Sequence, residues 1–118
     1  MPARRSPTQR AGDAAEAGAL DFLVARGLRP LARNVSSKLG EIDLIMQDRD
    51  ELVFVEVRAR SRSDFGGAAA SVGWAKQQRV RREAQRWLCA NFGDRWPACR
   101  FDVCAVRPGG IDWIRGAF

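Results

Sequence analysis

Hydrophobic positions recur with helical spacing in two segments of the chain. The first runs from Arg10 to Arg26, and Gly27 follows it, at the position where helices often end with glycine. The second covers about Val72 to Phe92. Its apolar stripe consists of Val80, Ala84, Trp87 and Leu88, which fall on one side of a helix. The sequence therefore predicts two amphipathic helices, each with one face for a hydrophobic core.

Alternating apolar and polar residues predict two strands between these helices, Glu41 to Gln47 and Glu51 to Arg58. The short turn QDRD joins them, so the pair is expected to form a β-hairpin. The segment LRPLARNV predicts an earlier strand, and Pro30 favours a sheet edge because proline donates no ladder hydrogen bond. After the second helix, the segments CRFDVCAV and IDWIRGAF predict two further strands separated by a Pro-Gly-Gly turn.

The order α-β-β-β-α-β-β predicts an α/β fold with a mixed central β-sheet and flanking helices on both of its faces. Because 118 residues support one compact core, residues 10–118 are expected to form a single domain. Residues 1–9 are rich in Pro, Arg and Ser and are expected to form a mobile N-terminal tail. The Gly- and Ser-rich segment SRSDFGGAAAS predicts a flexible loop before the second helix.

The hairpin register can be inferred from the distribution of its side chains. A turn at residues 47–50 places Glu41 opposite Glu56 and Asp43 opposite Phe54. One face of the hairpin is then purely apolar, with Ile42, Leu44, Met46, Val53, Val55 and Val57. The other face holds Glu41, Asp43, Ile45, Leu52, Phe54, Glu56 and Arg58. A slip of one residue would mix the two sets, so this division between faces is favoured.

Three carboxylates, Glu41, Asp43 and Glu56, meet at one end of the mixed face. Like charges that close together and partly buried either force protonation or need a counter-charge. Oxygen ligands at this spacing suit Mg²⁺, which binds one or two carboxylates together with substrate phosphate. Arg58 lies on the same face and can balance charge or stabilise developing negative charge. The alternative is that Arg58 and Arg60 simply form salt bridges with these acids.

Both predicted helices carry residues that could complete such a site. Glu16 lies in a run of small residues in the first helix, and it either points at the sheet or is solvated. Lys76 and Arg79 share one face of the second helix, which Arg82 and Arg86 extend. This face could hold phosphate groups or be an ordinary solvated surface. Trp74 at the helix start is open to base stacking or to a core role.

The amino-acid composition limits the catalytic mechanisms and the binding partners that are possible for the protein. The net charge is +6, which favours a polyanion such as nucleic acid, although arginine-rich composition can also arise from the base composition of a genome. The chain has no histidine, which excludes Ser-His and Cys-His catalysis. Cys89, Cys99 and Cys104 have no zinc or disulfide spacing and are expected to be buried free thiols in a reducing cytoplasm. No apolar stretch approaches the roughly 18 residues of a membrane span, so no membrane partner is expected.

The segment GEIDLIMQDRDELVFVEVR, with an upstream helical Glu and a downstream Lys, resembles the PD-(D/E)XK nuclease superfamily, which has the restriction-endonuclease-like fold. More narrowly, the chain resembles the YraN family of uncharacterised bacterial proteins. The motifs that match, in order, are GDAAEAGALDFLVARGL, RNV, GEIDLIM, FVEVRAR, FGGAAASV, RFDVCAV and WIRGAF. The resemblance covers about residues 10 to 118, and its motifs together are specific for the family.

The resemblance implies a role for several residues. Asp43 would be the central metal-binding Asp, Glu56 the acid of the E-x-K motif, and Glu16 the helical acid that completes the metal site. The main-chain carbonyl of Val57 would be a further metal ligand. Glu41 belongs to the GEID motif as an additional acid, and Lys76 occupies a position where the family commonly has lysine. The implied cofactor is Mg²⁺ or Mn²⁺.

One departure concerns the chemistry. The superfamily's E-x-K motif usually ends in lysine, and here it ends in Arg58. Arginine stays charged and is a poor general base, whereas lysine can release a proton. Arg58 could stabilise transition-state charge, and activation of the attacking water would then fall to the metal ion.

Three hypotheses for the function follow. The first is a metal-dependent endonuclease that hydrolyses DNA, with branched or recombination DNA as one substrate class, and with Lys76 and Arg79 binding phosphate. The second is a nucleic-acid-binding module that keeps the nuclease fold without turnover. The third is a structural or protein-interaction domain whose acids are paired internally. Many junction-acting nucleases are dimers, so a homodimer remains open, but no segment of the sequence marks an interface.

Overall fold

The computed structural model describes residues 6–60 and 72–118. Their elements follow one another in the order α-β-β-β-α-β-β. The elements are α1 (Pro7–Ala25), β1 (Arg29–Ser37), β2 (Gly40–Asp48), β3 (Glu51–Ala59), α2 (Trp74–Phe92), β4 (Ala98–Arg107) and β5 (Gly110–Ile114). The loop predicted over residues 61–71 lies outside the described residues, as do residues 1–5 of the predicted tail.

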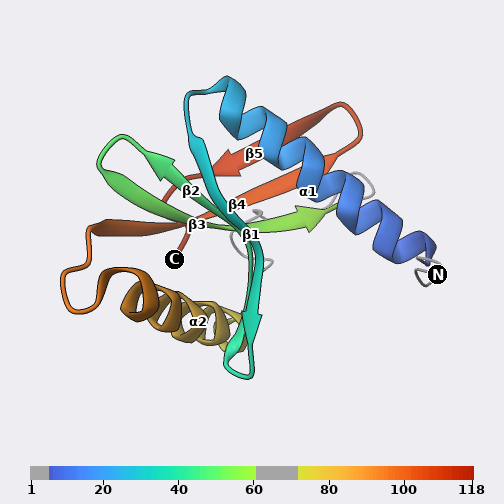
Figure 1. The fold of residues 1–118 in the computed structure, drawn as a ribbon. Helices are drawn as coiled ribbons and strands as arrows, with labels where there is room; N and C mark the ends of the chain where they lie inside the picture. Colours follow the sequence, from blue (N-terminus) through green and yellow to red (C-terminus); the bar gives the residue numbers. More distant parts are fainter. Residues whose placement is uncertain (1–5, 61–71) are drawn as a thin grey trace, which may run out of the picture.

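The five strands form one mixed sheet in the order β1-β2-β3-β4-β5. The pairs β1–β2, β2–β3 and β4–β5 are antiparallel, while β3 and β4 are parallel and connected through α2. Helix α1 covers one face of the sheet and α2 lies on the other (Figure 1). This confirms the predicted α/β fold with flanking helices, and the arrangement is consistent with a restriction-endonuclease-like fold. Pro30 lies on the edge strand β1, as predicted.

The ends of α1 follow from local sequence. Ser6 caps the helix in a capping box with Gln9, so the helix begins at Pro7 rather than at Arg10 as predicted. Residues 7–9 therefore belong to the helix and not to the expected tail. At the other end, Gly27 adopts a φ of 95°, and the N–H of Leu28 reaches back to the carbonyl of Leu23 at 3.1 Å. Glycine there allows the left-handed turn that closes the helix.

The two faces of the sheet carry separate hydrophobic clusters. On the α1 side, Leu23 packs with Leu44, Met46, Val53, Val55 and Cys104. On the α2 side, Val80, Ala84 and Leu88 pack with Ile45, Leu52 and Phe54. The predicted stripe of the second helix is thus confirmed, with Trp87 partly buried beside it. Of the three cysteines, Cys104 is buried as expected, Cys99 is half-buried, and Cys89 is exposed, contrary to the prediction.

The predicted register of the β2–β3 hairpin is wrong by two residues. Asp48 pairs with Glu51 and Ile45 with Phe54, so the turn contains only Arg49 and Asp50. The tight turn is possible because Arg49 adopts a φ of 56° and its carbonyl accepts a hydrogen bond from the Gln47 side chain at 2.7 Å. Because a shift of two residues keeps every side chain on its face, the predicted division between faces survives for most positions.

Ile42 is the exception to that division. It was predicted to lie with Leu44, but it packs on the α2 side with Ile45 and Phe54. The reason is a bend: Asn34 on β1 has a φ of 51°, and the pairing of β2 with β3 ends at Leu44. Beyond that point, the tip of the β1–β2 hairpin turns toward α2 (Figure 1).

Gly40 is required where this tip meets α2. A Cβ atom on Gly40 would collide with the main-chain carbonyl of Arg79. The glycine of the GEID segment therefore permits close contact between strand β2 and helix α2.

Neither α1 nor α2, the helices of the described residues, has the length and apolar character that a membrane span requires.

Candidate functional site

Asp43 and Glu56 meet where β2 separates from β3. Glu56 lies near the end of β3 and only 4% of its surface is exposed. The Oδ2 atom of Asp43 accepts a hydrogen bond of 2.8 Å from the main-chain N–H of Val57. This bond replaces the main-chain pairing that stops at Leu44. Because the N–H and C=O of one strand residue point to the same side, the Val57 carbonyl faces the same gap.

Burial and mutual repulsion raise the pKa of both carboxyl groups. Burial is the larger cause for Glu56, the charge of Asp43 adds to it, and together they raise the pKa of Glu56 to about 7. Burial also raises the pKa of Asp43, helped by the charges of Glu16 and Glu41 and opposed by the Val57 hydrogen bond. The Oε2 atom of Glu56 is buried without a hydrogen-bond partner among the described residues. The pair is thus an electrostatically unsatisfied anionic site.

Two cations approach Glu56. The Nζ atom of Lys76 lies 3.6 Å from Glu56 Oε1 and 3.6 Å from Glu41 Oε1. The Nε atom of Arg58 lies 4.0 Å from Glu56 Oε1. Lys76 is thus the nearer of the two, although it comes from α2 and not from the E-x-K position. Glu41 is mostly exposed and contributes to the site through Lys76.

Glu16 points at the sheet from α1, which excludes the solvated position that the sequence left open. It is 8% exposed, and its Oε1 atom accepts hydrogen bonds from Arg33 at 3.2 and 3.3 Å and from Asn34 at 3.1 Å. An open cleft of about 490 Å³ brings Glu16 to Asp43 and Val57. Glu56 belongs instead to the α2 side of the sheet, beside Lys76. Asp43 therefore lies between the two acids.

The predicted acids are neighbours but do not form a ready-made cage. Within residues 6–60 and 72–118, no group of three acidic or cysteine side chains lies close enough to hold a metal ion as placed. The reason is visible in the contacts: Glu16 is bonded to Arg33 and Asn34, while Glu41 is drawn outward to Lys76. Asp43, Glu56 and the Val57 main chain are the groups that the fold itself brings together.

The remaining predicted residues lie around this centre. Arg79 is exposed, and its main chain packs on Gly40; no contact between its side chain and the acids occurs in the described part of the chain. Trp74 is 74% exposed, which rules out the core role that the sequence left open. Its indole is accessible to solvent at the start of α2.

Sequence reasoning missed Glu83, which is fully buried on α2. Its carboxylate accepts hydrogen bonds from the Ser37 hydroxyl and from the Arg86 guanidinium, and the Arg86 bonds lower the pKa of Glu83. Glu83 thus ties the tip of the β1–β2 hairpin to α2. A signal was present: Glu83 falls between Val80 and Ala84 on the predicted apolar face, with Arg86 three residues later.

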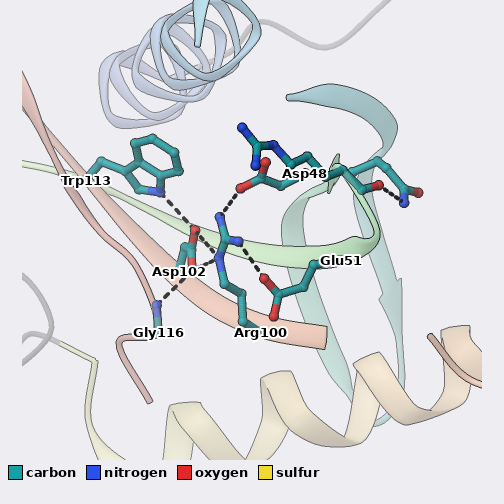
Figure 2. A network of polar contacts seen from close by, with 8 residues as sticks. Asp48, Glu51, Arg100, Asp102, Trp113 and Gly116 are labelled. Carbon is teal, nitrogen blue, oxygen red and sulfur yellow. Dashed lines mark hydrogen bonds and ion pairs between the residues drawn. The ribbon is translucent and has the colours of Figure 1, made fainter. Parts of the chain in front are cut away.

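A second polar centre lies at the opposite end of β3 (Figure 2). The Arg100 guanidinium bonds to Asp48 at 2.9 Å, to Glu51 at 2.8 Å and to Asp102 at 3.0 Å. The fully buried Asp102 also accepts hydrogen bonds from the Trp113 indole and the Gly116 main chain. We call these six residues the Arg100 network. Its carboxylates are all paired with Arg100, so it is a structural link rather than an open site.

Comparison with known proteins gives the family. Residues 15–106 match the group described as "Uncharacterised protein family UPF0102". A UPF0102 protein of Bordetella parapertussis is 51% identical over 117 residues, which span 96% of this chain and 66% of that protein. A UPF0102 protein of Cupriavidus metallidurans is 52% identical over 120 residues, covering all of this chain and 88% of that protein. The protein therefore belongs to UPF0102, the YraN family that its motifs resemble.

Proposed function

We propose that this protein is a Mg²⁺- or Mn²⁺-dependent endonuclease that hydrolyses phosphodiester bonds in DNA. The observation that carries the proposal is the pair of Asp43 and Glu56. Two carboxyl groups with raised pKa are held at the end of paired strands, and one of their oxygens is buried without a hydrogen-bond partner among residues 6–60 and 72–118. A buried acid pair with perturbed ionisation beside cationic side chains marks a candidate functional site.

The chemistry of the donor groups fits a hard divalent cation. Asp43, Glu56 and the Val57 carbonyl offer oxygen atoms, which Mg²⁺ and Mn²⁺ prefer, and Mg²⁺ needs only one or two carboxylates from the protein. Glu16 supports the site from across the cleft and would take part as a third acid. When bound, such an ion polarises a phosphoryl oxygen and activates water for attack.

The cationic side chains would act on the substrate. Arg58 keeps its charge and would stabilise the negative charge that develops on the phosphate. Lys76 lies beside Glu56 and would contact the phosphate next to the reacting bond, with the exposed Arg79 binding a neighbouring phosphate. The net charge of +6 supports a polyanionic substrate. Branched or recombination DNA is the substrate class that we propose to examine first.

A DNA-binding module without turnover is the second candidate. Two observations favour it: the E-x-K motif ends in Arg58, and Glu16 is bonded to Arg33 and Asn34. Under this alternative the acids are balanced by internal cations and the basic surface still binds DNA. An internally paired protein-interaction domain would show neither DNA binding nor cleavage.

Replacing Asp43 separates these functions. We expect wild-type protein to cleave at least one of linear, nicked, flap and four-way DNA in Mg²⁺ or Mn²⁺, and Asp43→Ala to lose at least about a hundredfold in rate because a metal-binding oxygen is removed. The variant should still melt cooperatively and bind DNA with a salt-dependent affinity. Asp112→Ala, which removes an exposed aspartate on β5 that is paired with Arg107, is the matched control. Absence of cleavage by the wild type on every substrate would exclude the enzyme.

A further inference from the structure

Lys76 places a positive charge next to Glu56, a buried carboxyl group that requires one when it is ionised. Its Nζ atom lies 3.6 Å from Glu56 Oε1 and 3.6 Å from Glu41 Oε1. Its side chain is only 22% exposed, and Glu56 beneath it is almost fully buried. An ionised carboxylate at that depth requires a counter-charge. Lys76 lies nearer to Glu56 than Arg58 does.

The kind of side chain that provides this positive charge determines how easily a substrate can displace it. The lysine ammonium is a compact charge on a flexible four-carbon stem, so it can leave one anion for another without moving the helix. Both of its contacts are 3.6 Å ion pairs, longer than the charge-assisted hydrogen bonds of 2.8 and 2.9 Å that Arg100 makes elsewhere in the molecule. The acids therefore hold Lys76 loosely.

We propose that Lys76 is a tethered counter-ion that competes with the divalent metal for Glu56 and that substrate phosphate draws it away, so metal and DNA bind cooperatively. This inference rests on the proposed function, because it requires a metal at Asp43 and Glu56. In the protein without DNA, Lys76 neutralises Glu56 and repels a divalent ion. When a phosphate takes over the ammonium group, Glu56 becomes available to the metal.

The physical basis is the reciprocity of coupled binding. If DNA increases the affinity for metal by a given factor, metal must increase the affinity for DNA by the same factor. The arrangement keeps the site weakly loaded until a phosphate arrives, which ties activation to the presence of substrate. Part of any such coupling would arise from direct contact between phosphate and metal, so the test must isolate the part that depends on Lys76.

The test is Mn²⁺ binding measured by isothermal titration calorimetry without DNA at pH 8.5. Lys76→Met keeps the apolar stem and removes the charge. We expect it to bind Mn²⁺ roughly tenfold more tightly than wild type, because a nearby positive charge is lost. Lys38→Met is the matched control: it removes the same charge from the exposed β1–β2 turn, and its affinity should stay close to that of the wild type. Lys76→Arg, which keeps the charge, should also resemble the wild type.

The second arm measures the coupling itself. Mn²⁺ affinity is compared with and without a saturating, cleavage-resistant phosphorothioate duplex. In wild type and Lys38→Met the duplex should increase the affinity for Mn²⁺. In Lys76→Met this increase should be smaller, by the same factor by which the substitution alone increases Mn²⁺ affinity without DNA. Thermal melting of each variant establishes that it is folded.

The outcomes are distinct. If the wild type binds Mn²⁺ and Lys76→Met binds it equally or more weakly, the inference is overturned while the proposed metal site stands. If neither wild type nor any variant binds Mn²⁺ with or without DNA, the proposed metal site fails, and the inference fails with it.

Discussion

At the scale of single residues, Glu56 is a buried carboxyl group whose ionised form is disfavoured by its surroundings. Burial and the neighbouring Asp43 raise its pKa from an ordinary 4.5 to about 7, against the lowering effects of Lys76 and Arg58. A carboxyl group that prefers to be protonated near neutral pH costs stability when it is ionised. The free-energy cost of ionising Glu56 is offset only when a cation of sufficient charge lies close to it. The burial that destabilises the ionised acid is therefore also what favours the proposed binding of a metal ion.

The stability of the metal-free protein should therefore depend on pH through Glu56. Because the folded pKa lies above the unfolded one, the folded state holds an extra proton between about pH 4.5 and 7, so stability falls as pH rises through this window and levels off above it. Glu56→Gln removes this dependence. We expect the stability of the variant relative to wild type to increase by roughly 3 kcal/mol across the window, at about 1.4 kcal/mol per pKa unit.

Urea denaturation in EDTA at several pH values checks this expectation. Glu41→Gln is the control, since Glu41 is mostly exposed and should retain the wild-type slope. Equal slopes for wild type and Glu56→Gln would show that Glu56 does not carry the extra proton.

At the scale of elements, the bent tip of the β1–β2 hairpin determines the site. The bend at Asn34 carries the tip to α2, where Gly40 packs on the Arg79 carbonyl and Ser37 bonds to Glu83. These contacts set the position of α2 along β2. Lys76, one turn before Arg79 on the same helix, is thereby placed over Glu56.

Gly40→Ala should disturb this contact. The added methyl group meets main-chain atoms of Arg79 that cannot rotate away, so we expect a loss of about 1–3 kcal/mol in the free energy of unfolding. Gly12→Ala on α1 is the matched control: apart from the backbone of its own helix, no described atom lies within 4 Å of its added Cβ. Better helix propensity should stabilise the protein by about 0.5–1 kcal/mol. Chemical denaturation distinguishes the two, and a neutral Gly40→Ala would mean that α2 shifts freely against β2.

At the scale of the whole molecule, the Arg100 network joins parts of the chain that are distant in sequence. It links the β2–β3 turn, strand β4 and the segment after β5 through one guanidinium and one buried aspartate (Figure 2). It lies at the opposite end of β3 from Glu56, so the two ends of this strand serve different purposes. One end is fully paired and holds the sheet together, and at the other the buried Glu56 Oε2 atom has no hydrogen-bond partner in the described part of the chain.

Removing Asp102 should be far more costly than removing a surface partner. Asp102→Ala leaves Arg100 and two hydrogen-bond donors without their buried acceptor, and we expect a loss of about 3–5 kcal/mol. Asp112→Ala removes the same type of partner from exposed Arg107 and should cost no more than about 1 kcal/mol. Urea denaturation compares the two variants; similar losses would contradict a central structural role for the network.

Much of the fold could be predicted because it depends on local patterns. The helical stripe ending at Leu88, the edge position of Pro30 and the glycine closure after α1 each follow from a few neighbouring residues. The hairpin register was wrong because residues 47–50 permit turns of two lengths, and both keep the faces of the sheet unchanged. The start of α1 depends on the capping box of Ser6 and Gln9, which the periodicity of apolar residues does not reveal.

The sequence by itself determined the order of the elements and which acids share one end of the sheet, since alternation and periodicity act over short distances. Only the tertiary structure decided which cations and hydrogen-bond donors surround those acids. The bend at Asn34, the pairing of Glu16 with Arg33 and the placement of Lys76 over Glu56 depend on contacts between distant segments. Burial and charge balance arise from all surrounding elements together, so residue spacing along one strand does not reveal them.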